Sequence, residues 1–388
     1  MKTVARVGVV LSMLAVVALL SGAFARPGDA SEEILVGLVA SQTTDLATYG
    51  KVQLGSVEMA VEKVNAEGGI KGRKIRLMVE DTAASNSVAL NALNKVLGSK
   101  PAAVLGPPMG TMVMAFMPVL KEDGVPFLAY PGTRRVTQQG YPALFRFVAH
   151  DGISKVAWTQ FAVEKLQKKK IGMLIVANEW GYSARDVTTN VLASKYNLKP
   201  VAVETYQASD KDMSAQLLRL KSAGVDLIMQ QGHGVDTALI LKQVRQLNLG
   251  VPVLASSAAQ TAAQLTITEG ADMKGVYVEG YPVPLQGDDA SVNAWGQEWE
   301  KRNKLKPDGF AVLTYDMAMC LFEVMKQYGT DRESIIRGLK TIKYPGLAST
   351  YSADKEGNML HESRIFQYDE NKRARTLERI VIPEKDRL

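Results

Sequence analysis

Short apolar runs alternate with segments of helical periodicity along most of the chain. The run ILVGLVA at residues 34–40 has no polar alternation, and it precedes a segment in which Leu54, Val57, Val61 and Val64 recur at helical spacing. Strands that lack polar alternation and are separated by helices are typical of a parallel sheet that helices cover on both faces. The pattern therefore predicts an α/β fold.

The alternation occurs in two sets, which meet near residue 150. The strands of the first set are predicted at residues 34–40, 75–81, 102–106, 125–130 and 144–149. The strands of the second set are predicted at residues 170–178, 199–206, 225–232 and 251–256. Each set has helical segments between its strands, so we predict two doubly wound, three-layer (αβα) lobes.

The last third of the chain is less repetitive. A strand-like run at residues 275–284 is followed by three helical segments and by strand-like segments near residues 349–357 and 363–369. Too few strands remain for a third domain, so we expect these segments to return and complete the two lobes. Ligands of open parallel sheets bind beyond the carboxyl ends of the strands, and the cleft between the lobes is the expected site.

The first 25 residues have the layout of a cleaved secretory signal peptide. Lys2 and Arg6 precede an apolar run that ends in the small-residue triplet AFA at residues 23–25. No later apolar window is long enough to cross a bilayer. We expect a mature chain that is exported to the periplasm.

Charge and cysteine content narrow the class of protein. The chain has 46 basic and 40 acidic residues; without Lys2 and Arg6 the balance is 44 to 40, a net charge of about +4 spread along the sequence. Such a balance gives no nucleic-acid footprint. Cys320 is the single cysteine, so no intramolecular disulfide can form and core burial must supply the stability.

The usual motifs of enzymes and cofactor sites are missing from the sequence. It lacks a G-x-G-x-x-G loop after the first strand, a Walker-type phosphate loop and a G-x-S-x-G nucleophile elbow. His150, His233 and His361 lie far apart in the sequence and have no metal-ligand spacing. We therefore expect a protein that binds without catalysis and needs no cofactor or metal.

Several distinctive segments follow one another in a familiar order. The most specific are NAEGGIKGRK at residues 65–74 and GVPFLAYPGT at residues 124–133. In these segments, and over essentially the whole mature chain, the sequence resembles type I periplasmic binding proteins, in particular the leucine/isoleucine/valine-binding type that serves ABC transporters. The resemblance implies two α/β lobes that close on a ligand.

The same resemblance implies three crossovers between the lobes. We place them near His150, near Val278 and at Tyr344 to Ala348. The lobes would then comprise residues 32–149 with 278–344, and residues 150–277 with 345–388.

Two loops of the first lobe match the positions where this family holds the α-carboxylate of its ligand. Gly110 and Thr111 stand where the family often has a hydroxyl and free backbone N–H groups, and Tyr130, Gly132 and Thr133 match the second loop. The first N–H groups of a helix are unpaired and carry its positive dipole end, so an anion fits there.

The remaining matched positions are Tyr49, an aromatic wall residue, and Trp180, where a tyrosine commonly covers the ligand; either aromatic could instead be ordinary packing. Two positions depart from the family pattern. His233 stands where an aromatic is common, and Ser257, with Ser256, stands where amino-acid binders usually have an acidic residue for the ligand ammonium. The ligand is therefore either an amino acid or an organic acid without an amino group.

We interpret the sequence as a monomeric, exported substrate-binding protein of an ABC importer. Its expected partners are a small carboxylate-bearing ligand and the permease subunits, with no nucleic acid. Two other classes stay open at this stage: a ligand-sensing receptor domain that acts with a separate signalling partner, and an enzyme with an unrecognised site.

Overall fold

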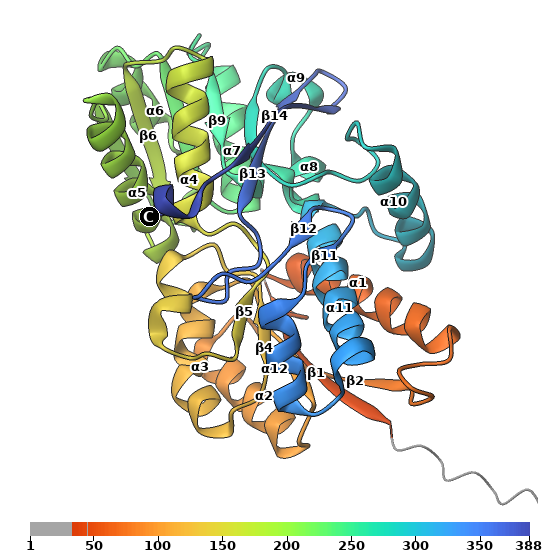
Figure 1. The fold of residues 1–388 in the computed structure, drawn as a ribbon. Helices are drawn as coiled ribbons and strands as arrows, with labels where there is room; N and C mark the ends of the chain where they lie inside the picture. The colour runs from red at the N-terminus through yellow and green to blue at the C-terminus, as the bar shows by residue number, and fades with distance from the viewer. Residues whose placement is uncertain (1–32, 45) are drawn as a thin grey trace, which may run out of the picture.

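The computed structural model describes residues 33–44 and 46–388, and the predicted signal peptide lies outside these residues. The described chain forms two α/β lobes, one below the other in Figure 1, with several chain segments passing between them. The predicted fold class is confirmed. No helix of the described residues is long and apolar enough to cross a membrane.

The first lobe is built on a parallel five-stranded sheet of order β2-β1-β3-β4-β5. Side chains of β1 alternate between its two faces: Val36 and Leu38 pack on the side of α1 and α11, whereas Val39 packs on the side of α2 and α3. The strands are β1 (Ile34–Ala40), β2 (Ile75–Asp81), β3 (Ala103–Leu105), β4 (Phe127–Ala129) and β5 (Leu144–Arg146). The helices are α1 (Ala47–Ala66), α2 (Asn86–Gly98), α3 (Gly110–Asp123), α11 (Gly309–Tyr328) and α12 (Arg332–Thr341).

The second lobe has a seven-stranded sheet of order β14-β13-β10-β9-β8-β6-β7, in which β13 runs antiparallel to both of its neighbours. Helices α4 and α5 cover one face, and α6 and α7 cover the other. The strands are β6 (Ile171–Val176), β7 (Ala202–Tyr206), β8 (Leu227–Gln231), β9 (Val253–Ala255), β10 (Tyr277–Gly280), β13 (Glu362–Tyr368) and β14 (Ala374–Val381). The helices are α4 (Asp151–Gln160), α5 (Glu179–Tyr196), α6 (Ser214–Ser222), α7 (Gly234–Gln246), α8 (Ala262–Ile267) and α9 (Gly270–Met273).

Two further elements complete the fold beside the first lobe. Helix α10 (Ala290–Asn303) lies against α1, where the indole Nε1 of Trp299 donates to Ser56 Oγ at 3.0 Å. Strands β11 (Tyr344–Pro345) and β12 (Thr350–Tyr351) form a small hairpin. Cys320 is completely buried in α11, and burial raises the pKa of its thiol.

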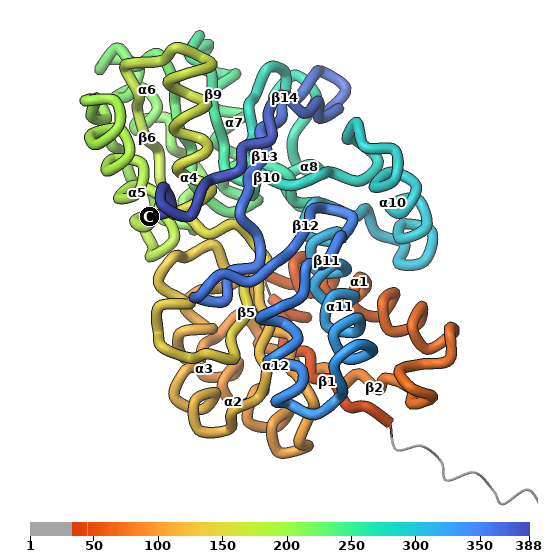
Figure 2. Tube along the Cα trace, in the orientation of Figure 1, coloured from red at the N-terminus to blue at the C-terminus, as the bar shows by residue number. Residues whose placement is uncertain are grey.

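Two of the lobe boundaries expected from the sequence differ from those of the structure. Val278 lies inside β10, which pairs with β9 and β13, so the chain leaves the second lobe only after Gly280. The boundary at residues 344–345 cuts the hairpin, whose Tyr351 packs on Phe147 and donates to Asp316 of α11 at 3.0 Å. The third crossover therefore follows Tyr351, and it is the dark blue segment that runs up to β13 in Figure 2.

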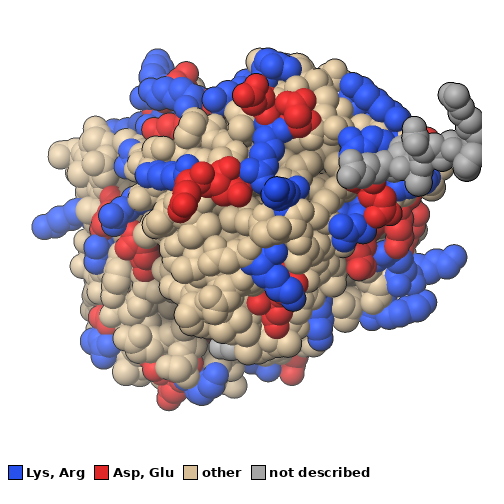
Figure 3. All heavy atoms as spheres, turned by 90° about the horizontal axis from the view of Figure 1, so that it is seen from below, with Lys and Arg blue, Asp and Glu red and all other residues tan. Residues whose placement is uncertain are grey.

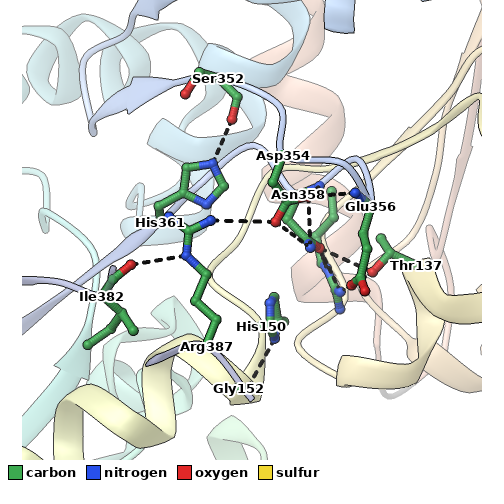
Figure 4. Close-up of polar contacts among 11 residues, drawn as sticks. Thr137, His150, Gly152, Ser352, Asp354, Glu356, Asn358, His361, Ile382 and Arg387 are labelled. Atoms are coloured by element: carbon green, nitrogen blue, oxygen red, sulfur yellow. Dashed lines mark hydrogen bonds and ion pairs between the residues drawn. The ribbon is translucent and has the colours of Figure 1, made fainter. Parts of the chain in front are cut away.

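A buried guanidinium joins the first and third crossovers. Arg146 at the end of β5 is fully buried, and it donates to the carbonyl oxygen of Thr133 at 2.6 Å and to Oδ1 of Asn358 at 2.9 and 2.8 Å. Figure 4 shows the surroundings of Asn358, whose Nδ2 donates to Asp354 Oδ2 at 2.9 Å. Arg387 pairs with the same carboxylate at 3.7 Å.

The C-terminal segment adds to this junction. The backbone N–H of Leu388 donates to the carbonyl oxygen of Gly152 at 3.1 Å, and Arg387 Nε donates to the carbonyl of Ile382 at 3.0 Å. Two histidines lie in this region, and both make contacts with the backbone. His150 accepts from the N–H of Gly152, and His361 contacts the carbonyl of Ser352 (Figure 4).

Replacing Arg146 with leucine should lower the free energy of unfolding by about 3 kcal/mol or more, because several buried acceptors lose a charged donor at once. Urea denaturation followed by circular dichroism measures the change. Arg76→Leu is the control, since the side chain of Arg76 is 54% exposed and pairs with Glu33 at the surface. Equal losses in the two variants would contradict the role given to Arg146.

Candidate functional site

A cavity lies between the two lobes at the carboxyl ends of their strands. The first lobe contributes the start of α1, the β3–α3 loop and the loop after β4; the second contributes the starts of α5 and α7 and the loop after β9. The first crossover, α4 and β10 close one side. The lining residues are Tyr49, Pro108, Met109, Gly110, Tyr130, Gly132, Thr133, Val148, Ala149, Asp151, Ser154, Lys155, Trp180, His233, Ser257, Ala258, Glu279, Tyr281 and Phe310.

The structure brings eight of the nine predicted site residues to this cavity. They are Tyr49, Gly110, Tyr130, Gly132, Thr133, Trp180, His233 and Ser257. Thr111 is not among the lining residues, and it is exposed. Because α3 begins at Gly110, Thr111 is already its second residue, and its hydroxyl does not reach the cavity that the sequence assigned to it.

The two predicted anion-binding loops meet at one corner of the cavity. The side chain of Met109, the N-cap residue of α3, makes no capping hydrogen bond. The first N–H groups of that helix are therefore available to a ligand. A methyl group on Gly110 would come within 2.5 Å of Thr133 Oγ1, which places the threonine hydroxyl beside the helix start. The Arg146 guanidinium donates to the carbonyl oxygen of Thr133 and so holds this loop in place.

Aromatic rings form a wall beside this corner. The ring of Phe310 lies 6.0 Å from that of Tyr49, 6.1 Å from that of Tyr130 and 5.7 Å from that of Tyr281, measured between centroids. Rings at such distances and tilts pack favourably and present apolar faces to the cavity. A compact hydrophobic group fits against this wall.

The second lobe contributes a stacked pair of rings. Trp180 and His233 lie 5.4 Å apart with an interplanar angle of 29°. Asn178 contacts His233 and caps the helix that carries Trp180: its Nδ2 lies 3.0 Å from His233 Nε2, and its Oδ1 accepts from the N–H of Gly181 at the start of α5. Burial lowers the pKa of His233, so the imidazole is neutral at neutral pH. It therefore carries no positive charge that would draw an anion away from the start of α3.

The lobes touch across the cavity in this structure. A methyl group on Gly132 would lie 2.8 Å from Trp180 Nε1, so this glycine permits the tryptophan of the other lobe to approach the backbone. Arg135 pairs with Glu179 at 3.2 Å, and the N–H of Ala262 donates to Asp308 Oδ2 at 3.0 Å. The arrangement is a closed cleft.

Three charged residues of the cavity were missed by the sequence analysis. Lys155 Nζ and Glu279 Oε2 are 2.7 Å apart with side chains only 2% exposed, and Glu279 Oε1 accepts from Ser363 Oγ at 2.9 Å. Lys155 also lies over the ring of Trp158 at 4.1 Å. Asp151, one helical turn before Lys155, completes the group.

A weak signal for one of these residues exists in the sequence. Glu279 interrupts the otherwise apolar run at residues 275–284, and a charge inside a buried element requires a partner. Burial raises the pKa of Asp151 to about 7, while the positive charge of Lys155 opposes that shift. The described residues contain no group of three or more His, Cys, Asp or Glu side chains arranged to hold a metal ion.

Two α/β lobes with a cavity between them, lined by loops at the carboxyl ends of their strands, define a two-lobed ligand-binding protein. The chain belongs to the periplasmic binding protein family, which it matches over residues 33–373. The family predicted from the sequence is thereby confirmed. The protein is a substrate-binding protein and not an enzyme.

Three known proteins illustrate the similarity. The chain is 27% identical to the leucine-, isoleucine-, valine-, threonine- and alanine-binding protein of Pseudomonas aeruginosa over 58% of this chain and 61% of that one. It is 24% identical to the Leu/Ile/Val-binding protein of Citrobacter freundii over 88% and 92%. A solute-binding protein of an ABC transporter from R. palustris, solved in complex with benzoate, has the same fold, with a TM-score of 0.79, 19% identity and coverage of 92% and 99%.

The buried pair of Lys155 and Glu279 yields a stability prediction. Lys155→Met should cost about 3–5 kcal/mol of unfolding free energy because it leaves the Glu279 carboxylate buried without a counter-charge. Adding Glu279→Gln to that variant should recover much of the loss, since the amide is neutral and can still accept from Ser363. Urea denaturation of both single variants and the double variant measures the coupling, and strictly additive losses would contradict it.

Proposed function

We propose that the protein is the exported substrate-binding subunit of an ABC importer and that it captures a small carboxylate-bearing ligand by closure of its lobes. The observation that carries the proposal is the cavity corner where the start of α3 and the Thr133 hydroxyl meet, beside an aromatic wall. A carboxylate would bind the N–H groups of α3, and a hydrophobic side chain would lie against Phe310 and Trp180.

The ligand class follows from the corner and the wall together. A hydrophobic or branched-chain amino acid, or a related organic acid, has both a carboxylate and a compact apolar group. Names of relatives support this range, since they include Leu/Ile/Val-binding proteins and a benzoate complex. Location in the periplasm is in keeping with the family and with the predicted signal peptide.

Closure of the lobes would be the event that the transporter detects. The contacts across the cleft, from Trp180 to the Gly132 loop and from Arg135 to Glu179, form only when the lobes approach, so a ligand that bridges them favours the closed state. We infer that the permease subunits recognise the closed surface of the monomer. On the face shown in Figure 3, acidic and basic side chains are interspersed.

A thermal-shift screen of the mature protein tests the proposed function. Leucine, isoleucine, valine and their deaminated acids are compared with isopentylamine, which has the leucine carbon skeleton without the carboxylate. At least one acid should raise the melting temperature, because a ligand at 100 times its Kd adds about 2.7 kcal/mol of stability. Stabilisation by the amine alone, or by none of the compounds, would overturn the proposal.

The cavity hydroxyl offers a second test. Thr133→Val should weaken binding of the stabilising acid by about 10- to 100-fold, because a hydrogen bond to a charged group contributes about 1.5–3 kcal/mol. Calorimetry measures the affinity. Thr111→Val is a matched control at the second residue of α3, and its affinity should equal that of the parent since Thr111 is exposed and is not among the lining residues. The reverse order of effects would contradict this site.

A further inference from the structure

The cavity lacks a carboxylate where amino-acid binders of this kind were expected to have one. That position is Ser257, which lines the cavity on the second lobe and carries no charge. An ammonium group enclosed in a closed cleft needs a paired carboxylate, since an uncompensated buried charge is costly. If the ligand has an ammonium group, another residue must accept it.

Asp151 meets the requirements for that acceptor. It lines the cavity at the start of α4, it is 1% exposed, and its Oδ2 has no hydrogen-bond partner among the described residues. Burial raises the pKa of the Asp151 carboxyl group, whereas the side chain of Ser183 on α5 lowers it. A buried carboxylate oxygen without a partner is rare in proteins.

The neighbouring charges do not satisfy Asp151. Lys155 directs its ammonium to Glu279, 2.7 Å away, and that pair is balanced. Arg146 stands behind the Thr133 loop, and its N–H groups are engaged with carbonyl oxygens, Asn358 and Thr137. Among the residues that line the cavity, Asp151 is therefore the acidic side chain whose Oδ2 has no hydrogen-bond partner in the described part of the chain.

Asp151 also lies next to the corner proposed for the carboxylate. Its backbone N–H donates to the carbonyl oxygen of Gly132 at 2.9 Å, so the aspartate is joined directly to the loop that carries Thr133. An α-amino acid has its ammonium and carboxylate on the same carbon atom. The carboxylate of such a ligand would reach the start of α3, and its ammonium group would reach Asp151, because the two sites adjoin at the same corner of the cavity.

We propose that Asp151 binds the ammonium group of the ligand in place of the acid missing at Ser257, which makes the ligand an α-amino acid with an apolar side chain. This inference rests on the proposed function, and it selects one of the two ligand classes that the proposed function allows.

Calorimetry with a matched pair of ligands tests the proposal. Leucine and 4-methylpentanoate share a carbon skeleton and differ by the ammonium group. The parent protein should bind leucine at least 100-fold more tightly. In Asp151→Asn, which keeps the size of the side chain, leucine affinity should fall about 100-fold while 4-methylpentanoate affinity stays the same or improves.

The controls separate the possible failures. Asp186→Asn makes the same change at an aspartate whose side chain is 66% exposed on α5, and it should leave both affinities unchanged. The ligand preference of the parent protein needs no variant, so the proposal stays testable if Asp151→Asn does not fold. Equal affinity of the parent for the two ligands, or an unchanged leucine affinity in folded Asp151→Asn, would overturn the role of Asp151. Failure of the parent to bind either compound, while another acid of the thermal-shift screen binds, would overturn this inference and leave the proposed function standing.

Discussion

The geometry of the binding cleft depends on one buried guanidinium. Arg146 ends the last strand of the first sheet, and from there it holds the backbone of the Thr133 loop and the side chain of Asn358 on the third crossover. An arginine can do this because its fork of donors reaches several carbonyl oxygens at once. The same side chain therefore fixes one wall of the cavity. It also connects the first and third crossovers, about which the lobes would move.

Much of the fold could be predicted because apolar strands and periodic helices alternate so regularly. The parallel strands of both sheets follow from runs such as ILVGLVA, in which every residue except Leu35 is buried. β14 and α4 are among the elements that escaped prediction, and for physical reasons. β14 carries Arg375, Glu378 and Arg379 at a sheet edge and ends at Val381, which is 61% exposed. α4 carries Asp151 and Lys155, yet it is buried along nearly its whole length.

Only the uncharged residues of the cavity could be predicted from the sequence. Glycines, threonines and aromatic residues in loops after strands marked Gly110, Thr133 and Trp180, because their positions follow from the resemblance to the family and from helix-start chemistry. The charged residues could not be found that way. Lys155 and Glu279 are 124 positions apart and become partners only when β10 is laid beside α4. A pattern in the sequence does not report which distant charge will neutralise another.

The buried thiol of Cys320 has a practical consequence for observing lobe movement. The side chain of this cysteine on α11 is completely buried, and its raised pKa keeps it in the unreactive thiol form. A maleimide dye would therefore attach to a newly introduced surface cysteine and leave the natural one untouched. Two such cysteines on opposite rims would report the opening and shutting of single molecules by energy transfer, without first removing any residue from the interior.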